Sequence, residues 1–185
     1  MDDHDATAPG HIMTPLRYLA GYPQPLLDQV TALLAEGHLR AHIERRHPEP
    51  HTVRNDQALG AYVADLKARH MKSAPPLAKV AYDNRLHVVH QALGTHTAVS
   101  RVQGSQLKAK REIRIASVFK DAPADFLRMI VVHELAHLRE RAHDKAFYAL
   151  CRHMAPDYHA LEFDTRVWLT ALELEGAGAR GAPRA

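Results

Sequence analysis

The feature that most constrains this chain is a group of histidines between residues 133 and 143. His133 and His137 are four residues apart with Glu134 between them, and His143 follows six residues after His137. Side chains four apart lie on one face of an α-helix, so the spacing predicts a helix whose two imidazoles can share one metal ion. His143 can reach the same ion only if this helix ends soon after His137 and the chain turns back.

The residues before the motif indicate where this helix begins. Asp121 is a residue type that caps helices, Pro123 suits a first turn, and Asp125 would lie near the positive end of the helix dipole. Further along, one apolar stripe is expected to face the core: Leu127, Val131, Leu135 and Leu138. The histidines lie beside this stripe, so we expect a core face and an adjacent metal-binding face.

Helices are also expected on both sides of the motif. Apolar residues recur with helical period over residues 25–47 and 55–72, and prolines follow each stretch. Two further helices are expected after the motif, at about residues 144–154 and 158–173. The chain ends contain few residues that could pack. We therefore expect a disordered N-terminus (1–15), one domain (16–175) and a flexible tail (176–185).

Between the two helical regions the sequence becomes strand-like. Segments rich in β-branched and apolar residues occur at 86–93, 97–103 and 112–119, with glycines between them. Ile113 and Ile115 alternate with Arg114, which is typical of a half-buried strand. A small antiparallel or mixed sheet is expected here, so the predicted fold class is α+β.

Composition excludes several classes of protein. The chain has one cysteine, Cys151, so it can form no intrachain disulfide, which suits the reducing cytoplasm. Its longest aliphatic run covers only residues 129–132, which predicts no membrane span, and the acidic residues 2–5 do not resemble a signal peptide. The formal net charge is +3, but basic residues are concentrated between Arg101 and Lys120.

The third metal ligand has two candidates, because a catalytic zinc typically takes three protein ligands and one water. The spacing from His137 to His143 is that of the metzincins, although those proteins have glycine where this chain has Glu140. Asp144 could cap the next helix and so permit a sharp turn before it. Glu162 follows His137 by the separation found in gluzincins. We favour His143.

The sequence around the motif is similar to the YgjP-like zinc metallopeptidases, which are relatives of the SprT and WLM groups. The similarity is carried by residues 132–138 and by residues 143–148, where an acidic residue and then an aromatic one follow the third histidine. It extends from about residue 18 to 172 and includes segments 18–23, 93–104, 153–159 and 161–166. The resemblance implies a zincin-like fold, zinc binding by His133, His137 and His143, and Glu134 as the general base.

Such a site suits more than one substrate. In the first reading, Glu134 deprotonates a zinc-bound water that attacks a peptide, which the strand at 112–117 could hold by strand addition. Candidates for oxyanion stabilisation are Tyr148, Tyr158 and His159. The alternative substrate is a nucleoside triphosphate, with phosphates bound by Arg101, Lys108, Lys110 and Arg111. A third reading, a nucleic-acid-associated module, is disfavoured by the low net charge and the absence of a recognised motif.

Overall fold

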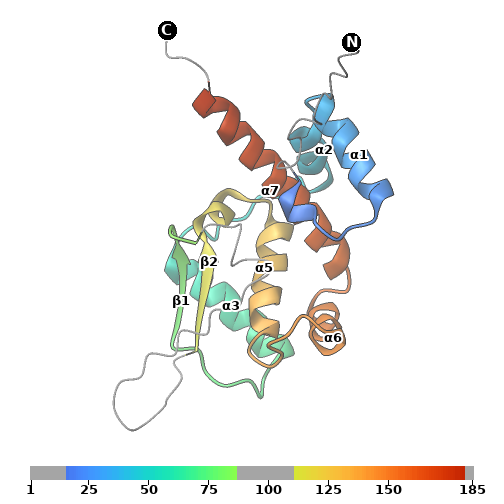
Figure 1. The fold of residues 1–185 in the computed structure, drawn as a ribbon. Helices are drawn as coiled ribbons and strands as arrows, with labels where there is room; N and C mark the ends of the chain where they lie inside the picture. Colours follow the sequence, from blue (N-terminus) through green and yellow to red (C-terminus); the bar gives the residue numbers. More distant parts are fainter. Residues whose placement is uncertain (1–15, 87–110, 182–185) are drawn as a thin grey trace, which may run out of the picture.

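Helix α5 (Ala124–Ala136) occupies the centre of the molecule (Figure 1). The computed structural model describes residues 16–86 and 111–181, with side chains placed as far as residue 176. Strands β1 (Lys79–Asp83) and β2 (Glu112–Ala116) lie with α3 (Asp56–His70) on one side of α5. Helices α6 (Lys145–Met154) and α7 (Tyr158–Gly181) lie on the other side. The predicted α+β fold class is confirmed.

The two described strands pair in parallel, and not antiparallel, which was one of the two arrangements expected. Val80 is opposite Ile113 and Tyr82 is opposite Ile115. Parallel neighbours need a long crossover connection, and the chain between β1 and β2 is long enough to supply one. Strand β1 was not predicted as a separate element. The strands expected at 86–93 and 97–103 lie, apart from residue 86, outside the described residues.

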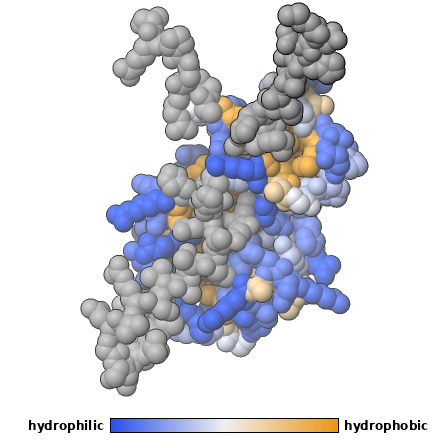
Figure 2. Space-filling view, in the orientation of Figure 1, coloured by the Kyte–Doolittle hydropathy of each residue, from blue (hydrophilic) through white to orange (hydrophobic). Residues whose placement is uncertain are grey.

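The N-terminal helical region is divided in two. The predicted helix over 25–47 is α1 (Gln24–Ala35) followed by α2 (Leu39–Arg46). Gly37 breaks it with a φ of 71°, a left-handed conformation that turns the chain so that the His38 N–H can donate to the Leu33 carbonyl at 3.0 Å. Figure 2 shows hydrophobic surface near these helices, and the leucines Leu27, Leu33 and Leu34 of α1 are only partly buried. Helix α2 packs against α7, as does the short 3-10 helix η1 (Arg17–Leu19).

Helix α5 is buried much more completely than its predicted single stripe requires. Elements α3, α6, α7, β2 and η2 (Ser117–Asp121) all contact it, so residues between the predicted apolar positions are also fully buried. The expected cap at Asp121 is wrong: Pro123 occupies the N-cap position, and the Ala124 N–H donates to the Glu49 carbonyl at 2.8 Å. Asp125 does lie in the first turn.

The other helices begin close to their predicted positions. Asn55 caps α3 by accepting a hydrogen bond from the Ala58 N–H, and Asp144 caps α6 as expected. Helix α7 begins at Tyr158 but continues to Gly181, beyond the expected end near residue 173. The expected disorder at 1–15 and the last four residues of the expected tail lie outside the described residues.

No helix in the described part of the chain has the length and apolar character needed to cross a membrane.

Candidate metal centre

Three histidine nitrogens meet at one point at the C-terminal end of α5. The Nε2 atoms of His133 and His137 are 3.1 Å apart, and that of His143 lies 3.2 Å from the first and 3.0 Å from the second. His133 belongs to α5, His137 is its C-cap residue, and His143 lies in the loop before α6. The structure therefore brings together all three histidines singled out by spacing.

The separations of these nitrogens match those required by a tetrahedral metal ion. Zinc–imidazole bonds of about 2.0–2.1 Å at tetrahedral angles place ligand nitrogens roughly 3.3 Å apart. The observed Nε2 separations of 3.0–3.2 Å are close to this value. Three neutral nitrogen donors with a fourth position open are the ligand set of catalytic zinc sites. The residues present therefore fit a divalent metal that favours imidazole.

Two of the histidines are held by hydrogen bonds to their other ring nitrogen. The Nδ1 of His137 lies 2.9 Å from the Glu140 carbonyl oxygen, which can only accept, so Nδ1 carries the proton and Nε2 presents its lone pair to the cluster. The Nδ1 of His133 lies 2.7 Å from the Tyr158 hydroxyl. Such partners fix the tautomer and the ring orientation of metal-binding histidines.

Phe147 forms an apolar floor beneath the cluster. Its ring centroid lies 5.0 Å from that of His133, 4.6 Å from that of His137 and 4.7 Å from that of His143. The side chain is fully buried. An aromatic ring in contact with all three imidazoles limits their motion and excludes water from one side of the centre.

The chain reversal that returns His143 to the helix needs no left-handed residue. No non-glycine residue in the described ranges has positive φ, and this includes Glu140 at the position of the metzincin glycine. The helix ends in a tight turn in which the Glu140 N–H donates to the Ala136 carbonyl at 3.0 Å. Asp144 then starts α6 by accepting hydrogen bonds from the N–H groups of Ala146 and Phe147. The predicted capping role of Asp144 is confirmed.

Glu134 lies between the first two histidines, and its carboxylate makes no hydrogen bond or ion pair within the described parts of the chain. Burial raises the pKa of Glu134 to about 8, because an ionised carboxylate loses hydration there. A cation bound to the neighbouring imidazoles would favour the ionised form. A carboxylate with this surrounding is suited to exchange protons with a water at the centre.

The remaining candidates occupy different positions. Glu162, the alternative third ligand, is buried and its Oε1 pairs with Arg166 Nη2 at 2.9 Å, apart from the group of converging nitrogens. Tyr158 is fully buried, and its hydroxyl lies against His133 Nδ1, on the opposite side of that ring from the converging Nε2 atoms. Tyr148 is half-buried and His159 is exposed, with their ring centroids 5.1 Å apart.

Of the basic group predicted to bind phosphates, only Arg111 lies among the described residues, where it is exposed just before β2. Arg101, Lys108 and Lys110 lie outside them.

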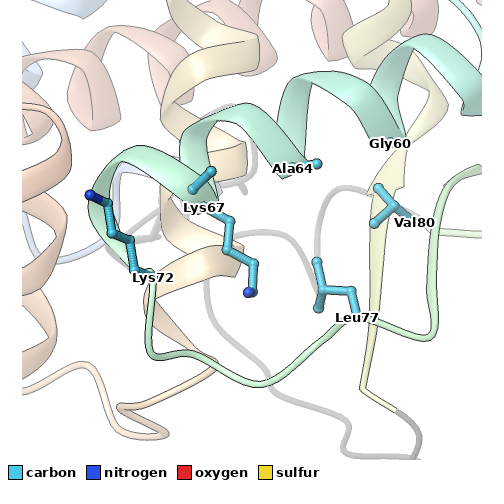
Figure 3. Close-up of a pocket in the computed structure, with 7 residues that line it drawn as sticks. Gly60, Ala64, Lys67, Lys72, Leu77 and Val80 are labelled. Carbon is cyan, nitrogen blue, oxygen red and sulfur yellow. The ribbon is translucent and has the colours of Figure 1, made fainter.

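A pocket lies between α3 and the segment that contains β1 (Figure 3). Its volume is about 630 Å³, and its lining includes Lys67, Lys72, Leu77 and Val80. The Lys67 ammonium group donates to the Ala74 carbonyl at 2.8 Å. None of the three histidines lines this pocket, so it is separate from the candidate metal centre.

Comparison with known proteins identifies similar sequences. A family model described as "YgjP-like, metallopeptidase domain" matches residues 16–165. The UTP pyrophosphatase of Escherichia coli (strain K12) is 59% identical over 162 residues, which cover 88% of this chain and 97% of that protein. No solved structure matches the chain. The residues matched by the family model include α5, the loop that carries His143, and α6.

Proposed function

Because this chain belongs to the YgjP-like metallopeptidase-domain family of metal-dependent hydrolases, we propose that it hydrolyses nucleoside triphosphates, UTP in particular, at a zinc centre. One observation favours this substrate over a peptide: the relative that is 59% identical over nearly its whole length is a UTP pyrophosphatase. In the proposed reaction, water attacks the α-phosphorus and the bond to the bridging oxygen breaks. The products are the nucleoside monophosphate and pyrophosphate.

Each residue of the centre has a proposed task. His133, His137 and His143 hold the metal through their Nε2 atoms. A metal bound there supplies Lewis acidity and an open coordination position. Glu134 orients the attacking water and accepts its proton. Tyr158 and the Glu140 carbonyl keep the imidazoles of His133 and His137 in the orientation required for binding.

Charge near the centre suits a polyanionic substrate. Arg141 and Lys145 lie two residues on either side of His143 in the sequence, and both are exposed. Cations at such positions attract a triphosphate and stabilise charge that develops on the transferred group. We propose that a second source of positive charge binds the phosphates, namely the basic residues Arg101, Lys108, Lys110 and Arg111.

Peptide hydrolysis is the second candidate, and the description of the matching family model favours it. The same water and the same general base can attack a carbonyl carbon. Strand β2 contacts α5, so it lies near the helix that carries the site, as peptide binding by strand addition would require. We propose a cytoplasmic location for either activity, because the chain cannot form an intrachain disulfide.

The two candidates are separated by comparing wild type with Glu134→Gln on UTP and on an unfolded protein, with bound metal measured in both. We expect pyrophosphate release from UTP by wild type and a loss of about 10²–10⁴-fold in Glu134→Gln, with metal content unchanged. Cleavage of the unfolded protein without release of pyrophosphate would reverse the assignment. UTP hydrolysis that survives intact in Glu134→Gln would remove the proposed general base.

A further inference from the structure

A small pocket lies beside the histidine cluster and has a different chemical character. Its volume is about 200 Å³, and it is lined by Ala20, Gly21, Tyr22, Tyr148, Glu162 and Arg166. These residues come from the loop between η1 and α1, from α6 and from α7. We call it the Glu162 pocket. It combines two tyrosine rings with one buried carboxylate, a combination suited to a flat ring that carries hydrogen-bond donors.

The pocket adjoins the metal centre through α6. Tyr148 lines the pocket, and its neighbour Phe147 packs against all three histidine rings. The ring centroid of Tyr148 is 6.3 Å from that of Tyr158, whose hydroxyl contacts His133. A ligand in the pocket can therefore extend a substituent towards the centre.

The Glu162 carboxylate is held in a fixed orientation. The residue is 5% exposed, and its Oε1 accepts a hydrogen bond from Arg166 Nη2 at 2.9 Å. Arg166 is itself anchored by a hydrogen bond from Nη1 to the Tyr18 carbonyl at 3.0 Å. Because Oε1 is committed to Arg166, Oε2 is the oxygen that can accept from a ligand. Arg166 thus acts as a positioning residue that holds the Glu162 carboxylate in its orientation.

We infer that the Glu162 pocket is the nucleobase subsite, in which the carboxylate accepts the ring N–H of uracil and the rings of Tyr22 and Tyr148 contact the faces of the base. This inference rests on the proposed function and adds to it a structural basis for choosing uracil over other bases. Uracil carries a donor at N3, whereas cytosine presents an acceptor at the same position. A carboxylate oxygen that accepts from the first repels the second, and Oε2 then has no hydrogen-bond donor from the ligand.

The test compares UTP, CTP and inorganic tripolyphosphate as substrates for metal-loaded wild type and Glu162→Gln. We expect wild type to prefer UTP to CTP in kcat/KM, and Glu162→Gln to lower that ratio by about 10- to 100-fold, the range for a hydrogen bond to a buried charge. Tripolyphosphate has no base, so its hydrolysis should change little. Glu173→Gln is the matched control, because Glu173 is an ion-paired carboxylate on the same helix whose partner is Arg17.

Two further measurements exclude a purely structural explanation. In equilibrium binding, the affinity for UMP should fall at least about tenfold in Glu162→Gln and stay unchanged in Glu173→Gln. In Tyr148→Leu, which keeps a side chain of similar bulk, loss of base stacking should weaken UMP binding by about 5- to 100-fold. This second variant keeps the inference testable if Glu162→Gln does not fold.

Distinct outcomes would overturn the two levels of the proposal. Equal losses on UTP, CTP and tripolyphosphate in Glu162→Gln, with an unchanged ratio of UTP to CTP, would show that Glu162 does not read the base. In that case nucleotide hydrolysis itself would stand. Wild type that releases no pyrophosphate from any nucleoside triphosphate would instead overturn the proposed function, and the nucleobase subsite with it.

Discussion

Replacing Tyr158 with phenylalanine removes one oxygen atom beneath the histidine cluster and leaves the ring in place. That oxygen lies 2.7 Å from His133 Nδ1. His133 is 2% exposed and Tyr158 is 0% exposed, so water cannot replace the lost partner. Removal of such an outer-shell partner typically costs 10–100-fold in metal affinity, which is about 1.4–2.8 kcal/mol. Loss of this hydrogen bond between two buried groups should also lower the free energy of unfolding of the metal-free protein by about 1–3 kcal/mol.

The assay for Tyr158→Phe is zinc competition with a chromogenic chelator, together with urea unfolding of the metal-free protein. Tyr82→Phe is the matched control, because the Tyr82 hydroxyl donates to the Val53 carbonyl at 2.6 Å on another part of the molecule. The control should lose about 1 kcal/mol of stability and no metal affinity. If Tyr158→Phe loses stability while binding zinc as tightly as wild type, the hydroxyl does not orient His133 for metal binding.

Three further predictions concern the surroundings of the centre. Phe147→Ala should lower the free energy of unfolding by about 3–5 kcal/mol in urea titrations, because it empties a fully buried site under three imidazoles; a loss below about 1 kcal/mol would contradict this packing role. Removing metal with a chelator should lower Tm, since metal at 100 times its Kd contributes about 2.7 kcal/mol, and an unchanged Tm would indicate that the native protein binds no metal. A hydrogen bond from Arg128 lowers the pKa of Asp157. Burial tends to raise the pKa of Asp125, but hydrogen bonds from His47 and Arg128 outweigh it and lower that pKa. The stability that these shifts contribute is present above the ordinary aspartate pKa of about 3.9 and is lost as pH falls through the lowered pKa values of the folded protein. Wild type should therefore be more stable than Arg128→Gln at neutral pH, and this difference should vanish in acid. A difference that persists at low pH would refute the ion pairing.

Local sequence was sufficient to predict the helices and the positions of the three histidines. The pairing of His133 with His137 depends on helix period, and Asp144 caps its own helix through neighbouring N–H groups, so both are readable over a few residues. The division of the first helical region was missed because apolar periodicity continues across Gly37. Gly37 itself was the available signal, since glycine after a helix often adopts a left-handed conformation.

Contacts between distant residues could not be predicted in this way. Tyr158 meets His133 across 25 residues of sequence. Nothing in the sequence predicts the contacts of His47. Its two ring nitrogens each lie 2.9 Å from a carboxylate, one of Asp125 and the other of Asp164. The parallel pairing of β1 with β2 depends on a crossover, which strand patterns alone do not specify. Such features follow from how helices pack around α5.

The most direct test of this account is a metal titration of the metal-depleted protein with pyrophosphate release from UTP as the readout. Activity should rise in proportion to added zinc and saturate near one equivalent per chain. His143→Ala should bind zinc weakly and show little activity at that equivalence point, because the centre loses one of its three converging nitrogens. Pyrophosphate release that is independent of metal content, or is undiminished in His143→Ala, would contradict the central claim.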